Sequence, residues 1–326
     1  MPRLSILIPC FDPAAELEDT LVSVLQNRPR DCEVLVIHTQ QYSDPYNLRD
    51  EVQLLRVSGR VSLCQLANSG LAAATGEVVH LLLPGMAATE NWTDEPLSHF
   101  DDPEVACVAP IVVQANDPTK LVSAGVTRGW IASRKVVGAG AAASLAQPRR
   151  WNVLGPTFAA GFYRRSVLES LGGIATHLTD DLADIDLALS IQALGLLSIL
   201  EPKSRLIEQQ PVAKPKASVG LGKARELLFW RHAQLRGPVS LLLHPIAAMA
   251  ESVAASTGNG GAVASELVGR LLGLAAVGTA ARHGQKLADA RETLAAGEAP
   301  ASLSLAEARR EKSAADQTAA PARRAA

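Results

Sequence analysis

The feature that most constrains this chain is the alternation of short apolar runs with helical segments near its amino terminus. Apolar runs rich in β-branched residues occupy 4–9, 32–37, 53–57 and 78–83. Leucines at helical spacing follow the first run, and others precede the last, where we expect a helix that ends at Gly76. Strands that alternate with helices in this way predict a mostly parallel sheet covered by helices.

Further mixed structure is expected up to residue 210, and helices alone after residue 215. We expect strands at 105–113, 158–163 and 196–200, a hairpin over 122–131 that turns at Arg128-Gly129, and a mobile loop over 138–146. Helices are expected at 165–171 and at 179–194, the second with Thr179 and Gly195 as its caps. Three more helices are expected at 222–235, 240–255 and 262–296. The predicted organisation is an α/β domain over 1–210, a helical carboxy-terminal extension over 211–297 and a disordered tail over 298–326.

The composition excludes several classes of function. The formal net charge is -2, so no general electrostatic attraction to nucleic acid is expected. The four cysteines form no C-x-x-C pair, which argues against a zinc site or a redox dithiol. No signal peptide and no membrane-spanning run of about 18 apolar residues is evident. We therefore expect a cytoplasmic protein with reduced thiols, and peripheral contact with the inner face of the membrane remains an alternative.

The runs LSILIPCFDPAAELEDTLVSVL and ANSGLAAATGEVVHLLL, with motifs that follow them, occur in the order of a known family. The first run resembles the opening strand and helix of family 2 glycosyltransferases, and the second resembles that family's segment before the metal-binding strand. Asp184-Ile185-Asp186-Leu187 resembles the catalytic Glu-Asp-x-Asp helix, and Leu228-Phe229-Trp230-Arg231-His232 is similar to a helix that follows the domain. The resemblance implies a GT-A fold, a nucleotide-sugar donor and a role in polysaccharide biosynthesis.

The resemblance also implies which residues line the site. Ligands of open α/β sheets bind at the carboxyl ends of the strands, here near 10–12, 38–44 and 83–85. The residues implied are Asp184 as general base; Pro9, Asp12, His38, Asn68, Leu83 and Gly85 on the nucleotide-sugar side; and Gly161 and Asp186 on the acceptor side. Each of these residues also has a non-functional interpretation. Asp184 and Asp186 would then be solvated carboxylates early in a helix, and His38 would be a surface residue at the end of a strand.

The chain departs from the family pattern where that pattern is acidic. Leu83-Pro84-Gly85 stands at the metal-binding Asp-x-Asp position, and Ala183 stands at the Glu of Glu-Asp-x-Asp. Leucine, proline and glycine supply no side-chain oxygen for a hard cation, so we expect no metal site of the family type and no metal cofactor. Three basic pairs, Arg134-Lys135, Arg149-Arg150 and Arg164-Arg165, are candidates to neutralise a diphosphate instead.

Three functions remain open from the sequence. The first is a glycosyltransferase-like protein without metal-dependent sugar transfer that binds a nucleotide sugar or a glycan. The second is an active, metal-independent inverting transferase with Asp184 as its base. The third is a non-catalytic partner that oligomerises through its carboxy-terminal helices or holds an active glycosyltransferase. The apolar helices at 240–255 and 267–281 are expected to pack on the main domain or on a second subunit, and membrane contact through them is a separate alternative.

Overall fold

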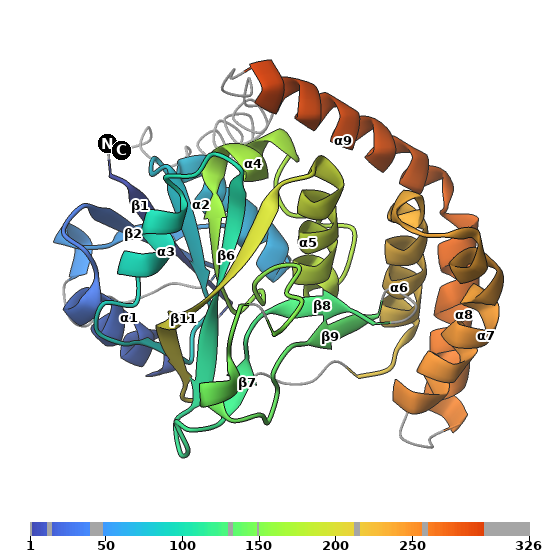
Figure 1. The fold of residues 1–326 in the computed structure, drawn as a ribbon, viewed down its shortest axis with the longest axis horizontal. Coiled ribbons are helices and arrows are strands. Elements are labelled where there is room, and N and C mark those ends of the chain that lie inside the picture. Colours follow the sequence, from blue (N-terminus) through green and yellow to red (C-terminus); the bar gives the residue numbers. More distant parts are fainter. Residues whose placement is uncertain are drawn as a thin grey trace, which may run out of the picture.

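The protein folds around one mixed sheet that is covered by helices on both faces (Figure 1). The computed structural model describes residues 2–11, 15–39, 48–129, 133–148, 150–211, 216–255 and 260–296. The strands of the large sheet are ordered β3-β2-β1-β4-β10-β6-β11-β5, with β7 paired to β6. The mixed sheet with its helical layers confirms the predicted α/β fold class.

The first four strands are parallel, as the alternation predicts. They are β1 (Leu4–Cys10), β2 (Cys32–His38), β3 (Gln53–Arg56) and β4 (Val78–Leu82), with α1 (Ala15–Asn27) and α2 (Leu63–Ala73) between them. A single 3₁₀ turn (Leu48–Asp50) is the described helical element between β2 and β3. Helix α2 ends at Ala73, before the predicted Gly76, because the N–H of Ala74 already closes the last turn on Gly70 and Leu71.

The second half of the sheet is mixed, which the sequence did not predict. Strand β10 (Ala160–Arg164) runs antiparallel to both β4 and β6 (Val105–Gln114), whereas β11 (Leu197–Glu208) runs parallel to β6. The short strands β5 (Met86–Ala88) and β7 (Leu121–Ser123) were not predicted, and each pairs antiparallel to a long strand. Helices α3 (Asp94–His99), α4 (Arg165–Ser170) and α5 (Ala183–Leu194) complete the layers.

A small hairpin replaces the one predicted over 122–131. It pairs β8 (Val126–Arg128) with β9 (Arg134–Val136), so the returning strand comes later than expected. Residues 138–146, predicted to be mobile, pack against the domain instead: Ala143 and Ala146 are buried, and Ala142 bridges to Lys120. The expectation failed because small residues were taken as a sign of mobility rather than of close packing.

Alternate side chains of the central strands serve two separate cores. On β1, Leu4, Ile6 and Ile8 pack with leucines of α1. Leu7, between them, packs on the other face with side chains of α2 and α5. This two-sided burial explains why the strand sequences read as continuous apolar runs.

The carboxy-terminal part is helical, as predicted, and lies beside the α5 side of the sheet (Figure 1). Its elements are α6 (Val219–Arg231), α7 (Pro238–Ala255), α8 (Gly260–Ala275) and α9 (Gly278–Ala296). The predicted helix over 262–296 is two helices, which separate at 276–277. None of the described helices is both long enough and apolar enough to cross a membrane.

The buried His80 of β4 generates a pH prediction. Its side chain is fully buried against Phe162 and Trp92, with Nδ1 3.1 Å from the carbonyl oxygen of Gly161. Burial outweighs that hydrogen bond and lowers the pKa of His80 to about 3, whereas an unfolded histidine titrates near ~6.5. Between these two values the unfolded chain binds one more proton than the folded chain, so stability falls as the pH falls.

We expect the free energy of unfolding to drop by about 2 kcal/mol through His80 between pH 7 and pH 5. Urea denaturation at several pH values measures the drop. The variant His80→Phe keeps the ring stack without the titrating group, so its pH dependence should be shallower by about one proton. An unchanged pH dependence in His80→Phe would contradict the assignment.

Candidate functional site

Three strand ends converge at the carboxyl edge of the parallel half of the sheet. Cys10 at the end of β1 lies opposite His38 at the end of β2, and Pro9 lies opposite Ile37. Strand β4 pairs with the other side of β1 and ends beside it at Leu82. His38 is 5% exposed, so the alternative that it is a surface residue at a strand end is wrong. Segments 12–14 and 40–47, which follow β1 and β2, lie outside the described residues, and with them the predicted site residue Asp12.

The turn after β4 is held firmly in place. The N–H of Gly85 donates to the Thr20 hydroxyl of α1 at 3.0 Å, and its carbonyl accepts from the N–H of Gln209 at 2.9 Å. Gly85 has φ +88°, a backbone conformation that favours glycine. At the start of the turn, the N–H of Leu83 donates to the carbonyl of Ala159 at 2.9 Å. This turn is therefore a defined part of the edge.

Asp184 lies next to that turn. The N–H of Leu83 bonds to Ala159, and the N–H of the preceding residue, Phe158, donates to Oδ2 of Asp184 at 3.1 Å. The structure thus brings Leu83 and Asp184 together across residues 158–159. The end of β4 and the start of α5 are therefore adjacent, while the role of Asp184 as a general base stays a prediction.

The Asp184 carboxylate is buried and fully occupied. Arg134 of β9 grips it with Nε at 2.8 Å from Oδ1 and Nη2 at 2.7 Å from Oδ2. The N–H of Ile185 adds a third donor, at 2.7 Å from Oδ1. Asp184 is 2% exposed, so the expectation of a solvated carboxylate is wrong. Fork-like pairing of this kind is strong and directional, and it holds the carboxylate as an acceptor.

Arg134 is the partner of Asp184 that the sequence did not reveal. It was one of six arginine or lysine candidates, and nothing in its own segment marks Asp184 as its partner 50 positions away. Burial opposes the charge of Arg134, but the Asp184 carboxylate outweighs it and raises the pKa of the guanidinium. Its side chain is 28% exposed, and Nη1 has no partner among the described residues.

Asn68 and Gly161 have structural contacts that account for them. Both groups of the Asn68 amide bond the backbone of Ile174, each at 2.8 Å, which holds the turn after α4. Gly161 lies so close to Pro156 that a Cβ would meet the proline ring at 2.6 Å. A nucleotide contact for Asn68 and an acceptor contact for Gly161 stay predictions.

Asp186 faces the helical extension. It is 3% exposed, and its Oδ1 accepts from Nε of Arg231 at 2.7 Å and lies 2.8 Å from Nε2 of His232, both in the segment that ends α6. Burial alone would raise the pKa of Asp186, but these two partners lower it well below its usual range. Asp186 therefore ties α5 to α6, and an acceptor contact for it also stays a prediction.

One group of side chains within the described part of the chain has the composition of a metal site. Ligand atoms of Asp186, His232 and His283 lie within 4.8 Å of one another, and all three residues are buried. Burial and the charge of Arg231 lower the pKa of His283 to about 3, so it is neutral and able to coordinate. The guanidinium of Arg231 already supplies positive charge to Asp186, however, which opposes a second cation there.

The other basic pairs serve the framework where they are described. Arg164 donates to the carbonyls of Phe100, Asp102 and Val105, and Arg165 donates to the carbonyl of Gly76. Arg149 lies outside the described residues. Of the described pairs, the one that contributes an arginine beside Asp184 is Arg134-Lys135.

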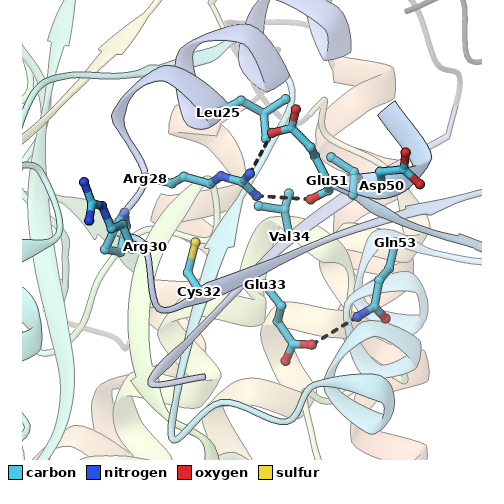
Figure 2. A pocket seen from close by; sticks show the side chains of 11 residues that line it. Leu25, Arg28, Arg30, Cys32, Glu33, Val34, Asp50, Glu51 and Gln53 are labelled. Atoms are coloured by element: carbon cyan, nitrogen blue, oxygen red, sulfur yellow. Dashed lines mark hydrogen bonds and ion pairs between the residues drawn. The ribbon is translucent and has the colours of Figure 1, made fainter. Parts of the chain in front are cut away.

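A separate hollow of about 530 Å³ opens at the opposite end of the strands (Figure 2). It lies at the start of β2, where Arg28 and Glu51 form an ion pair at 2.7 Å across it. Glu33 points toward Gln53 on the neighbouring strand and bonds to it at 3.3 Å. The hollow is at the amino ends of the strands, so it is distinct from the edge where Asp184 lies.

Comparison with known proteins identifies the fold. No protein-family model and no curated protein matches this chain. A crystal structure of GalNAc-T7 with UDP, GalNAc and Mn²⁺ superposes with a TM-score of 0.58 at 16% identity, over 74% of this chain and 49% of that one. This chain therefore spans about half the length of GalNAc-T7. The likeness shows that the protein has the GT-A glycosyltransferase fold, as predicted.

A second solved structure aligns over more of its own length. It is the mannosyltransferase PcManGT from Pyrobaculum calidifontis in complex with GDP-Man and Mn²⁺, with a TM-score of 0.49 at 20% identity, over 90% of this chain and 87% of that one. The Mn²⁺ of the GalNAc-T7 structure raises the question of which groups here could hold such an ion. Among the described residues at the β4 turn, Leu83, Pro84 and Gly85 offer no side-chain oxygen, and the carboxylate of Asp184 is bonded to Arg134.

The ion pair of Arg134 and Asp184 generates a stability prediction. Arg134→Met leaves a buried carboxylate without its charged partner, which we expect to lower the free energy of unfolding by about 3 kcal/mol. Arg134→Met combined with Asp184→Leu removes both charges and should recover most of that loss. Urea denaturation of the single and double variants measures the coupling.

Lys135→Met is the matched control, because it removes a positive charge from an exposed neighbour on the same strand. It should change stability by no more than about 0.5 kcal/mol. Equal losses in Arg134→Met and Lys135→Met would mean that the pair contributes nothing specific.

Proposed function

We propose that this protein binds a nucleoside-diphosphate sugar at the carboxyl ends of β1, β2 and β4 without a divalent cation at that edge, and that it lacks metal-dependent sugar transfer. The observation that carries the proposal is the pair of Arg134 and Asp184 beside the turn Leu83-Pro84-Gly85. A GT-A fold supplies the strand edge, and Arg134 supplies a guanidinium where the family resemblance implies a metal.

A guanidinium at this edge supports binding of a diphosphate. Arg134 has two nitrogens on Asp184, its Nη1 has no partner among the described residues, and its side chain is 28% exposed. A guanidinium is matched in geometry to phosphate oxygens and serves the same electrostatic purpose as a cation at a leaving group. Arg134 is therefore the residue that we assign to the diphosphate.

The state of Asp184 supports the absence of robust transfer. A general base needs a free lone pair within reach of the acceptor hydroxyl. In Asp184 the two oxygens accept from Arg134, Phe158 and Ile185, and the carboxylate is buried. A carboxylate held in this way orients the arginine rather than accepting a proton.

A metal-independent inverting transferase is the second candidate, because Asp184 keeps the position of the family's base next to the β4 end. In that case a donor phosphate would draw Arg134 away and free the carboxylate. EDTA-resistant transfer or donor hydrolysis that Asp184→Asn abolishes would establish this second function in place of the first.

Calorimetric titration with UDP and GDP, in EDTA and then in Mn²⁺, tests the binding proposal. We expect one nucleotide to bind with a Kd below about 1 mM, and Mn²⁺ to change that Kd by less than twofold. Arg134→Gln combined with Asp184→Asn removes both charges together and should weaken binding at least about tenfold, a difference of roughly 1.4 kcal/mol.

Lys135→Gln is the control variant and should bind as the wild type does. Binding that rises more than about tenfold with Mn²⁺ would contradict the proposal of a metal-free edge. If His283→Ala then removed that metal dependence, the ion would lie at the cluster of Asp186, His232 and His283. Absence of binding to both nucleotides, with or without Mn²⁺, would overturn the proposal.

A further inference from the structure

The hairpin of α7 and α8 exposes apolar side chains and buries its charged ones, the reverse of a helix pair that faces water. Ten large apolar side chains on these two helices are exposed, with Leu242 at 79% and Ile246 at 71%. The ten are Val239, Leu242, Leu243, Ile246, Met249, Val253, Val268, Leu271, Leu272 and Leu274. Every exposed residue described within the two helices is Pro, Val, Leu, Ile, Met, Ala or Gly. Monomeric soluble proteins rarely expose an apolar surface of this extent.

The charged groups of the hairpin point inward and are paired there. Nη2 of Arg270 lies 2.6 Å from Glu251, and Arg225 of α6 bonds to the fully buried Glu266. Nε2 of His244 lies 2.8 Å from Glu226 of α6. Each ionisable side chain described on α7 and α8 thus has a partner of opposite charge or a hydrogen-bond partner within the protein, and none of the exposed residues described on the two helices is charged.

Helices α6 and α8 pack through close backbone contacts at glycines. Gly269 and Gly273, four residues apart, bring α8 onto the backbone of α6 at Val219 and Lys223, and Gly222 of α6 meets the carbonyl of Glu266. A Cβ at any of these glycines would clash with the facing helix. Close backbone approach through small residues, with polar groups bonded between helices, is how helices associate in lipid.

The composition of the apolar surface distinguishes between the occupants that can cover it. The exposed positions run from 238 to 254 on α7 and from 260 to 275 on α8, and none of them has a charged or hydrogen-bonding side chain. The two helices lie on the side of the molecule away from β1 and β2 (Figure 1). An interface between proteins carries a polar rim around its apolar centre. Hydrocarbon requires no polar partner, so lipid fits this surface better than another copy of the chain does.

We propose that the hairpin of α7 and α8 seats the protein on a membrane, with its outer half in the hydrocarbon just below the headgroups. Helices of 18 and 16 residues are about 27 and 24 Å long, which is short for a crossing of a ~30 Å core. An element of this kind lies along the interface. The inference rests on the hairpin alone and is independent of the proposed nucleotide-sugar site.

Flotation of the full chain with vesicles of pure phosphatidylcholine, in low and in high salt, tests the proposal. Since the outer surface carries no charge, we expect binding to neutral vesicles that 0.5 M salt does not weaken. Ile246→Glu combined with Leu271→Glu should lower the bound fraction at least about tenfold, because each change removes an apolar side chain from hydrocarbon. Val22→Glu is the matched control: Val22 is also an exposed apolar helix residue, at 50%, but it lies on α1.

Depth is measured with tryptophan variants. Fluorescence of Ile246→Trp should be quenched by vesicles with brominated acyl chains more strongly than that of Val22→Trp. Far-UV circular dichroism checks that the variants fold, and wild-type fluorescence corrects for the native tryptophans.

Three outcomes would overturn the proposal. A wild-type chain that does not float, and that light scattering shows to be a dimer which the double Glu variant separates, would make the hairpin an interface between copies. A wild-type chain that stays monomeric and does not float would show that lipid does not cover the hairpin. Binding that needs anionic lipid and is lost in salt would assign the attraction to charge rather than to this surface.

Discussion

Two buried carboxylates at the start of α5 connect this helix to the β8–β9 hairpin and to the helical extension. Asp184 pairs with Arg134 on the sheet side, and Asp186, two residues on, pairs with Arg231 on the side of the extension. A buried charge without its partner costs several kcal/mol, so each pair fixes the elements that carry it. One helical turn thereby sets both the edge of the sheet next to Leu83 and the docking of α6.

The fold could be predicted from the sequence where local pattern and tertiary contact agree. The apolar runs of β1, β2 and β4 are buried on both faces, so their composition alone identified them. Strands β5 and β7 are three residues each and form only because a longer strand lies beside them, which no local pattern records. The returning strand of the hairpin, β9, is also three residues long, and the sequence placed it too early.

The sequence named Asp184 from its motif but not the contacts that this residue makes. The structure places Asp184 beside the β4 end, and its role as a general base stays a prediction. That its carboxylate is gripped by Arg134 could not be read from the sequence, because the partner comes from a strand of three residues 50 positions earlier. For Asn68, the motif suggested a contact with a ligand, but in the structure its amide forms two hydrogen bonds with the backbone of Ile174. A motif position fixes where a side chain lies more reliably than it fixes what the side chain bonds.

Helix α6 has a geometric consequence beyond its role in packing. Its Arg231 is bonded to α5, while Glu226 and Arg225 on the same rod are bonded to α7 and α8. A helix of 13 residues is about 20 Å long and stiff, and its glycine contact with α8 leaves no room for sliding. Helix α6 therefore links the start of α5 to the hairpin through bonds to both. With the apolar side chains of α7 and α8 in a bilayer, α6 acts as a spacer that sets the distance between the bilayer and the strand edge beside Asp184.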